Sequence, residues 1–221
     1  MARLARVVVP GVPHHVTQRG NRRQDTFFCD EDYEVYKALM AEWCAKCGVQ
    51  VWAYCLMPNH VHMILVPKTA TSLARAVGEA HRRYTLHINA RKKWSGYLWQ
   101  GRFSSFPMDN AHLLSAAAYV ERNPVKAELV RSARQYAWSS ARAHISGQDD
   151  DLVKVAPLLK RCSDWPGLLR GKDDPTMLEA FRAHKSTGRP LGGKAFVDKL
   201  ELKLGRTLRP AKRGRKPIQV G

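Results

Sequence analysis

Residues 49–67 read VQVWAYCLMPNHVHMILVP, which is two apolar runs, 49–57 and 60–67, separated only by Pro58 and Asn59. Aromatic and β-branched residues on both sides of a two-residue turn predict two antiparallel strands joined in a hairpin. His60 and His62 are the polar exceptions in the second run. Because side chains alternate along a strand, both imidazoles should point to one face, with α-carbons roughly 6.5 to 7 Å apart.

Further elements are expected on both sides of this hairpin. Upstream, the alternating segment 14–19 predicts a strand and residues 30–48 predict a helix that ends at a glycine. Downstream, we expect a long helix over 72–93, strand character within 97–108 and a third helix capped by Asn110. This order contains the split βαβ pattern of a ferredoxin-like antiparallel sheet with helices on one face. The sequence therefore predicts an α+β fold.

The composition changes along the chain. Residues 1–145 contain all the expected strands and should form one domain. Residues 146–204 consist of short helical pieces broken by proline and glycine, which predicts a helical appendage. Residues 205–221 are basic, rich in proline and glycine and without apolar periodicity, which is typical of a flexible tail.

Charge limits the functions that the chain can have. The 221 residues include 37 Lys and Arg against 19 Asp and Glu, a formal net charge of +18. This excess predicts a polyanionic partner, and nucleic acid fits best. We find no run of about 18 apolar residues and no secretory signal, so we expect a cytoplasmic protein without membrane contact.

The two histidines predict a metal site. Two neutral imidazoles on a rigid strand leave coordination positions open, which suits a divalent metal that also holds a substrate oxygen. A structural zinc site would need four protein ligands. The alternative is a pair of hydrogen-bonded histidines on a half-exposed sheet face, and the HxH pattern alone does not exclude it.

A second candidate group lies in the third helix. Tyr119 stands four residues before Asn123, so both side chains should project from one helical face within about 6 Å. Pro124 cannot donate a backbone hydrogen bond and disfavours helical geometry at Asn123, so we expect a kink or a restart there. Asn123 is therefore either a metal ligand or the N-cap of a new helix. Tyr119 is either functional or an ordinary packed tyrosine.

Together these segments resemble a known family. HVH in the strand, YVERNPVKA in the helix, the amino-terminal PGVPHHVTQRGNRR and LWQGRF are similar to the single-tyrosine HUH transposases, and most similar to their REP-associated tyrosine transposase branch. The resemblance covers nearly the whole chain. It implies that Tyr119 is the catalytic nucleophile and that His60 and His62, with Asn123 as a third candidate ligand, bind a divalent metal, Mg²⁺ or Mn²⁺.

The resemblance also implies a function. It predicts an endonuclease that cleaves and rejoins single-stranded DNA through a 5′-phosphotyrosine link, beside a hairpin of the REP type. Two alternatives remain: a hairpin-binding protein without catalysis, and a metal-dependent phosphodiesterase that uses water. We expect no small-molecule cofactor, and a monomer ahead of an oligomer.

Basic and aromatic residues are the expected DNA contacts, because phosphate neutralisation and base stacking use these side chains. They follow the first strand, line the second helix, flank the next strand and fill the tail. They are Arg19, Arg22, Arg23, Arg82, Arg83, Lys92, Lys93, Trp99, Arg102, Arg206, Arg209, Lys212, Arg213, Arg215 and Lys216. The alternatives are a solvated helix face for the second group and core packing for the tryptophan. The tail is expected to grip the duplex stem of a hairpin.

Overall fold

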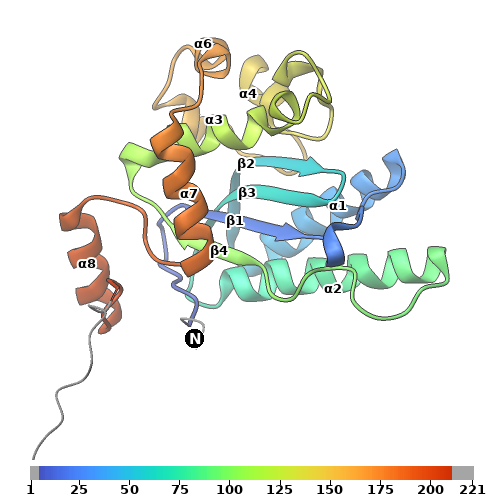
Figure 1. Cartoon of the computed structure of the whole chain (residues 1–221), viewed down its shortest axis with the longest axis horizontal. Helices are drawn as coiled ribbons and strands as arrows, with labels where there is room; N and C mark the ends of the chain where they lie inside the picture. Colours follow the sequence, from blue (N-terminus) through green and yellow to red (C-terminus); the bar gives the residue numbers. More distant parts are fainter. Residues whose placement is uncertain (1–4, 211–221) are drawn as a thin grey trace, which may run out of the picture.

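A computed structural model of the chain describes residues 5–210 (Figure 1). Its centre is a four-stranded antiparallel sheet with the strand order β2-β3-β1-β4. The strands are β1 (His14–Arg19), β2 (Val49–Met57), β3 (His60–Pro67) and β4 (Ser104–Pro107). The 49–67 hairpin is thus confirmed, and β3 lies inside the sheet between β1 and β2.

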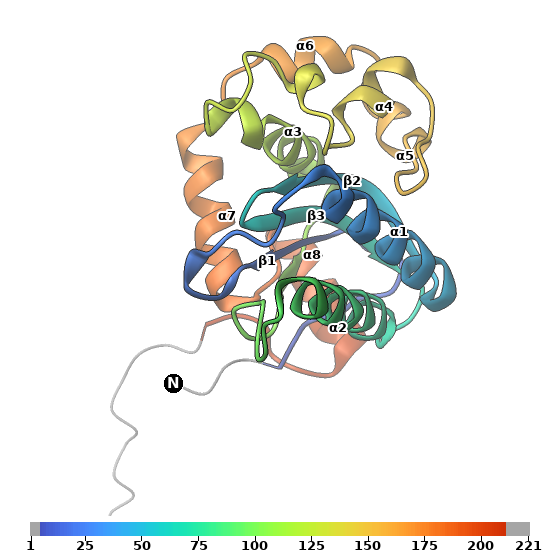
Figure 2. The ribbon, with the colours of Figure 1, turned by 90° about the vertical axis from the view of Figure 1, so that its right-hand side faces the viewer.

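Helices cover both faces of this sheet. On one face lie α1 (Asp30–Cys47) and α2 (Ser72–Lys92), and on the other lies α3 (Asn110–Lys126) (Figure 2). The first two helices and the strand order confirm the ferredoxin-like class. The expectation that the helices lie on one face needs correction, because α3 covers the opposite face.

Alternation along β3 divides the core into two halves. Val61, Met63 and Leu65 pack toward α1 and α2, whereas Ile64 and Val66 pack toward α3. The helix meets them with a buried alanine run, 116–118. Since alanine side chains are short, the backbone of α3 can lie close to the sheet. This close approach brings residues that follow the run near β3.

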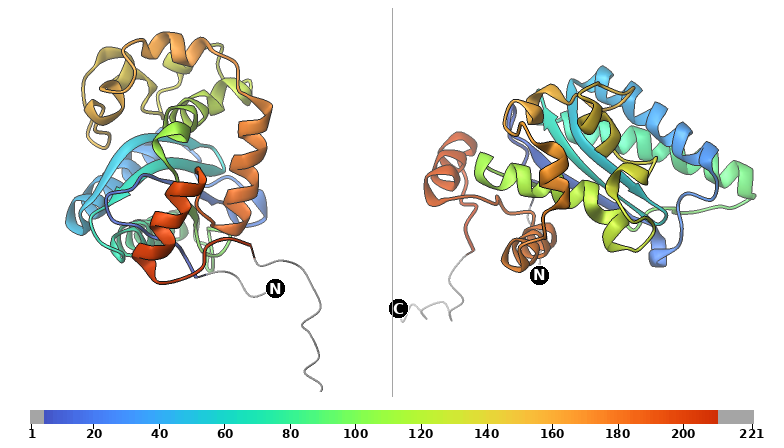
Figure 3. Two further views of the ribbon diagram at one scale, coloured as in Figure 1. Left: turned by 90° about the vertical axis from the view of Figure 1, so that its left-hand side faces the viewer. Right: turned by 90° about the horizontal axis from the view of Figure 1, so that it is seen from above.

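One short helix, η1 (Asn21–Arg23), precedes α1. The remaining helices follow α3 along the chain: η2 (Ala133–Gln135), α4 (Ala141–Ser146), α5 (Ala156–Leu159), α6 (Trp165–Arg170), α7 (Pro175–Thr187) and α8 (Lys194–Leu204). Helix α7 runs beside α3 and β4 (Figure 3). Its Phe181 is buried against Phe106 and Tyr119. The appendage therefore shares the core of the α3 face.

One local expectation was confirmed in part and two were wrong. Strand structure within 97–108 is limited to β4, because Gly101 adopts a left-handed φ of 64° and the chain before it bends. The N-cap of α3 is Asp109 rather than Asn110. The helix then continues through Pro124 without a restart.

The start of the expected flexible tail is packed. Leu208 is buried in a small cluster with Val7, Val9 and Leu200 of α8, so residues 205–210 belong to the folded part. Four predicted tail contacts lie outside the described residues: Lys212, Arg213, Arg215 and Lys216. Among residues 5–210, no helix is long and apolar enough to cross a membrane.

Candidate functional site

The two histidines of β3 face α3, as the alternation predicted. His62 is only 3% exposed and His60 is half-buried, and their ring centroids lie 5.1 Å apart. Val61 between them points into the other half of the core. The pair occupies the start of β3, directly after the hairpin turn.

Hydrogen bonds orient both imidazoles. His60 Nδ1 lies 2.6 Å from the side-chain oxygen of Asn59, so Nδ1 carries the proton and Nε2 keeps a lone pair. His62 Nδ1 lies 3.0 Å from His15 Nε2, whose ring stacks on that of His62. When His62 donates this bond, its Nε2 is likewise available. Both side chains can therefore present Nε2 to one ligand.

His15 was not selected by the sequence reasoning. It lies on β1, opposite Ile64 of β3, so its side chain is on the same face as His62. Alternation within residues 14–19 places it on the face of Thr17 and Arg19, but only the β1–β3 register shows that this is the face of the histidine pair. Its Nδ1 is buried and has no partner among the described residues.

The imidazoles are held in their neutral form. Burial lowers the pKa of His15 and of His60 to about 3, and the cations of Arg19 and Lys185 add to the effect on His60. Burial also lowers the pKa of His62 well below its ordinary value. Neutral imidazole is the form that ligates a metal, so the electrostatics suit ligation at neutral pH.

Tyr119 lies across from the histidine pair on α3. Its ring centroid is 5.5 Å from that of His62 and 6.1 Å from that of His15, edge-on in both cases. Burial raises the pKa of the phenol, while Arg182 and the Asn123 side chain lower it. The structure thus brings together the two motifs, separated by nearly 60 residues, that the sequence singled out.

Asn123 lies inside α3 and is not an N-cap. Its Nδ2 donates to the backbone carbonyls of Tyr119 at 2.8 Å and Val120 at 3.4 Å. Pro124 has no N–H for the carbonyl of Val120, so the amide takes over part of that role and the helix continues. The N-cap interpretation is wrong. With Nδ2 engaged, Oδ1 is the atom that can ligate a metal.

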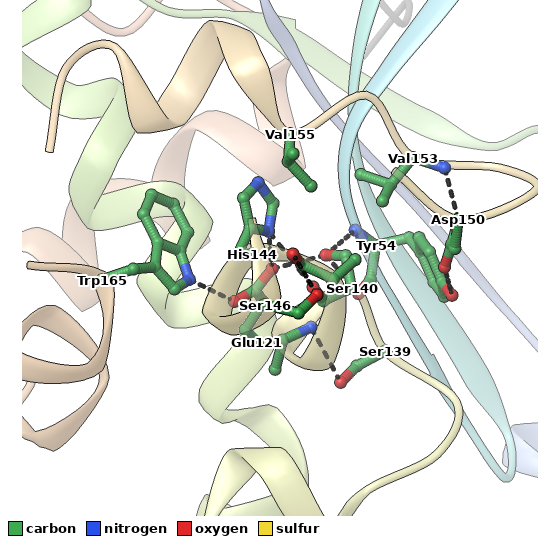
Figure 4. Close-up of polar contacts among 12 residues, drawn as sticks. Tyr54, Glu121, Ser139, Ser140, His144, Ser146, Asp150, Val153, Val155 and Trp165 are labelled. Carbon is green, nitrogen blue, oxygen red and sulfur yellow. Dashed lines mark hydrogen bonds and ion pairs between the residues drawn. The ribbon is translucent and has the colours of Figure 1, made fainter. Parts of the chain in front are cut away.

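A buried polar network holds α3 in place (Figure 4). Glu121 accepts hydrogen bonds from Ser140 Oγ at 2.5 Å, His144 Nδ1 at 2.6 Å and Trp165 Nε1 at 2.8 Å. Ser140 also accepts from the Tyr54 backbone N–H on β2. The helix that carries Tyr119 is thereby tied to the sheet and to the appendage.

Three arginines lie close to the start of β3. Arg19 ends β1 directly opposite His60 in the register. Arg22 and Arg23 lie in η1, and this helix and the residue before it contact the hairpin turn. The Gly20 N–H donates to the Asn59 carbonyl at 2.8 Å, and Asn59 Nδ2 donates to the Arg23 carbonyl at 3.1 Å. These three predicted DNA contacts therefore lie beside the histidines.

Four other predicted contacts lie on or at the end of α2, on the opposite face of the sheet: Arg82, Arg83, Lys92 and Lys93. Glu79 pairs with both arginines, and the ammonium of Lys92 lies 4.4 Å from the centre of the Phe28 ring. The structure does not bring this group together with the histidine pair and Tyr119.

The expected role of Trp99 in base stacking needs correction. Its side chain is 6% exposed and stacks on His81 at 4.6 Å within the core of the α2 face. Arg102 is exposed and lines a cavity with Arg19. Arg206 donates to backbone carbonyls of residues 5 and 6, and Arg209 pairs with acids of α8. These two tail arginines are engaged within the chain.

The donor set for a metal is small. Within residues 5–210, no three His, Cys, Asp or Glu side chains are grouped so as to hold an ion. The candidate ligand atoms are His60 Nε2, His62 Nε2 and Asn123 Oδ1, two nitrogens and one amide oxygen. Such a set leaves open positions for substrate and water oxygens and suits a divalent cation.

The histidine pair on a central strand, facing a tyrosine on a packed helix, now has a family context. The sequence profile of the IS200-like transposases matches residues 9–123, more than half of the 221-residue chain, and the chain belongs to this family. The matched range includes His60, His62, Tyr119 and Asn123. The family resemblance drawn from the sequence is confirmed.

Solved structures extend the comparison. The fold is similar to that of a REP-associated tyrosine transposase bound to a REP hairpin, with a TM-score of 0.58, 19% identity, and coverage of 68% of this chain and 90% of that one. A proposed transposase from Deinococcus radiodurans aligns with a TM-score of 0.39, 20% identity, and coverage of 55% and 97%. No curated protein sequence gives a significant match. At this identity the first structure confirms the HUH-type fold.

Proposed function

We propose that this chain cleaves and rejoins single-stranded DNA beside a REP-type hairpin, with Tyr119 as the nucleophile. The observation that carries the proposal is the position of the Tyr119 ring, 5.5 Å from that of His62 across the layer between α3 and the sheet. We propose a hairpin as the partner because the REP-associated transposase with a similar fold is bound to a REP hairpin. The net charge of +18 supports a DNA partner.

The proposed reaction is a transesterification. The Tyr119 oxygen attacks the scissile phosphorus in line, the tyrosine O–P bond forms, and the bond from phosphorus to the 3′ oxygen breaks. The phenol loses its proton and the leaving 3′ oxygen gains one. The products are a 5′-phosphotyrosine and a free 3′-hydroxyl. Because the phosphodiester energy is kept, attack by another 3′-hydroxyl can rejoin the strands without ATP.

His60 and His62 through Nε2, with Asn123 through Oδ1, would hold Mg²⁺ or Mn²⁺ beside this phosphate. Bound there, the cation supplies Lewis-acid stabilisation of the charge that develops on the phosphate oxygens. Asn59 and His15 keep the two imidazoles in their orientation, as outer partners of ligating histidines do. Arg182 lowers the pKa of the phenol against the effect of burial and so favours loss of its proton.

The three arginines close to the start of β3 are assigned to the DNA strand. Arg19, Arg22 and Arg23 lie next to the hairpin turn that positions His60. Their guanidinium groups can pair with backbone phosphates on either side of the cut. A single-stranded substrate is required, since a stacked duplex cannot bring a phosphate between α3 and the sheet.

A gel assay tests the proposal. A labelled hairpin with a single-stranded foot is incubated with the protein and Mg²⁺ and is analysed under denaturing conditions. We expect a cleaved strand and a covalent protein–DNA adduct for the parent, and neither for Tyr119→Phe. His60→Ala and EDTA should also stop cleavage.

The alternatives give different results in the same assay. Cleavage without an adduct, retained in Tyr119→Phe, would indicate a hydrolase that uses water. Tight binding to the hairpin without cleavage under any metal would indicate a binding protein. Chelator-resistant cleavage would exclude the proposed metal site.

A further inference from the structure

A cavity of about 340 Å³ opens beside the histidine pair, on the side of β1 and β4. It is lined by Thr17, Gln18, Arg19, Gln100, Arg102, Ser104 and Lys185. In the register of β1 and β3, Thr17 lies opposite His62 and Arg19 lies opposite His60. Since neighbouring strands are about 4.8 Å apart, the cavity begins one strand away from the proposed scissile phosphate.

Three cations from three separate segments meet in this cavity. Arg19 comes from the end of β1, Arg102 from the loop before β4, and Lys185 from α7 of the appendage. Across residues 5–210, no ion pair or hydrogen bond involves any of these three charged groups. By contrast, Arg82 and Arg91 of α2 pair with Glu79 and Asp32, and Arg209 pairs with Asp198 of α8.

Lys185 is placed at an electrostatic cost. Burial and the neighbouring Arg19 lower the pKa of its ammonium, and its charge in turn lowers the pKa of His15 and His60. A half-buried lysine that faces another cation destabilises the fold unless an anion joins them. Such an arrangement is typical of a binding site for a charged ligand.

Thr17, one of the lining residues, is only 4% exposed, and its Oγ1 is buried and makes no hydrogen bond within the described chain. Buried polar groups in proteins are almost always satisfied, so this hydroxyl is a second unsatisfied group in the residues around the cavity. An anionic oxygen in the cavity would pair with the three cations.

We infer that this cavity binds a backbone phosphate of the single strand next to the scissile phosphate, and that Lys185 is its main cation from the appendage. The inference rests on the proposed function for the identity of the strand. It assigns to α7 a direct part in holding substrate. The strand would leave the histidine pair across β1 and pass between α7 and the loop that carries Arg102.

Affinity measurements with single neutral phosphates test this assignment. Binding of a hairpin with a single-stranded foot is measured for the full chain carrying Tyr119→Phe, so that cleavage does not interfere. Each phosphate beside the cut is replaced in turn by an uncharged methylphosphonate. We expect one position at which affinity falls about fivefold to tenfold, as for loss of a charge-assisted hydrogen bond.

The same series is then measured with Lys185→Ala added. Affinity for the unmodified strand should fall by a similar factor, and the slope of log affinity against log salt should fall by roughly 0.7. In this variant, a methylphosphonate at the sensitive position should lower the affinity little further, because the cation that paired with the native phosphate is gone. Lys185→Arg should keep both the affinity and the position dependence.

Lys160→Ala is the matched control. This exposed lysine is the C-cap of α5, away from α7 (Figure 2), and its removal subtracts the same charge. It should leave the position dependence intact. Because Lys185 faces Arg19, Lys185→Ala should unfold at the same temperature as the parent or higher, which separates lost binding from lost structure.

Two results would overturn the inference. One is a methylphosphonate profile that is identical in the presence and absence of Lys185. The other is a Lys185→Ala protein that binds no more weakly than Lys160→Ala. Neither depends on cleavage, so a failure of the tyrosine mechanism would appear only in the gel assay, with this coupling unaffected.

Discussion

Replacement of Glu121 by glutamine should destabilise the fold, although the two side chains have nearly the same shape. Glu121 is fully buried, and all three of its neighbours are donors. One carboxylate oxygen receives Ser140 and His144, and the other receives Trp165 (Figure 4). Glutamine offers one oxygen and one NH₂ group, so it can satisfy only one side.

The cost follows from that mismatch. Suppose that the glutamine oxygen accepts from Ser140 and His144. Its NH₂ group then faces the indole N–H of Trp165, so two donors meet where Trp165 Nε1 and Glu121 Oε2 lie 2.8 Å apart in the parent. A buried donor without an acceptor costs about 1–3 kcal/mol. Glu121→Ala leaves the indole N–H of Trp165 without an acceptor, and leaves Ser140 Oγ and His144 Nδ1 only their longer contacts to the Tyr54 and Ser140 carbonyls at 3.3 and 3.2 Å. It should cost about 3–5 kcal/mol, a large part of the stability of a typical domain.

Urea and thermal unfolding of the full chain measure these changes. For a chain of this size, about 2 kcal/mol corresponds to a fall of about 4–8 °C in the unfolding midpoint. Glu128→Gln is the control, because Glu128 is exposed just after α3 and should change stability by no more than about 0.5 kcal/mol. If Glu121→Gln unfolded together with this control, the network would not hold α3 as we describe.

Three further predictions concern pH, the asparagine and the tail. Burial lowers the pKa of His14 to about 4 and the pKa values of His15 and His81 to about 3, so the unfolded chain binds more protons than the folded one between those values and 6.5. Stability should therefore be complete above pH 6.5 and fall below it, by up to about 1.4 kcal/mol per pH unit for each histidine; equal urea midpoints at pH 7 and pH 5 would contradict this. Asn123→Ala removes two hydrogen bonds to backbone carbonyls and should lower the stability of the fold by about 0.5–1.5 kcal/mol. This variant should also cleave more slowly at low Mg²⁺ and recover in part at high Mn²⁺. Unchanged cleavage at limiting metal would exclude Asn123 as a ligand. Truncation after Pro210 should weaken hairpin binding and lower the salt slope by roughly 0.9 for each phosphate that the tail neutralises, whereas an unchanged slope would leave the tail without a DNA contact.

The central fold was predictable because its signals are local. Two apolar runs of aromatic and β-branched residues on either side of a two-residue turn define the 49–67 hairpin, and helical spacing defines α1 and α2. The segment before β4 has the same apolar character but a different outcome. There the Trp99 side chain packs on His81 of α2 and the chain does not continue as a strand. This outcome depends on tertiary contacts, which the local sequence pattern does not contain.

The main residues of the candidate site could be predicted from the sequence, but the contacts that hold them in place could not. The HxH spacing places two imidazoles on one face, and the i, i+4 spacing places Tyr119 and Asn123 on one helix. The N-cap alternative for Asn123 was wrong, because a proline inside a helix is tolerated where a side chain serves the freed carbonyl. His15 acquires its meaning only from the pairing of β1 with β3.

The appendage shapes the chemistry of the site although it lies beyond the family match, which ends at residue 123. Phe181 of α7 packs on Tyr119 and His15, and so contributes to the burial that keeps the histidines neutral. One turn further along α7, Lys185 adds a charge that lowers the pKa of His60 in the same direction. One helix thus supplies both an apolar side chain that buries the imidazoles and a cation that lowers the pKa of His60. Because both effects stabilise unprotonated Nε2 atoms, the histidine pair and α7 form one electrostatic unit.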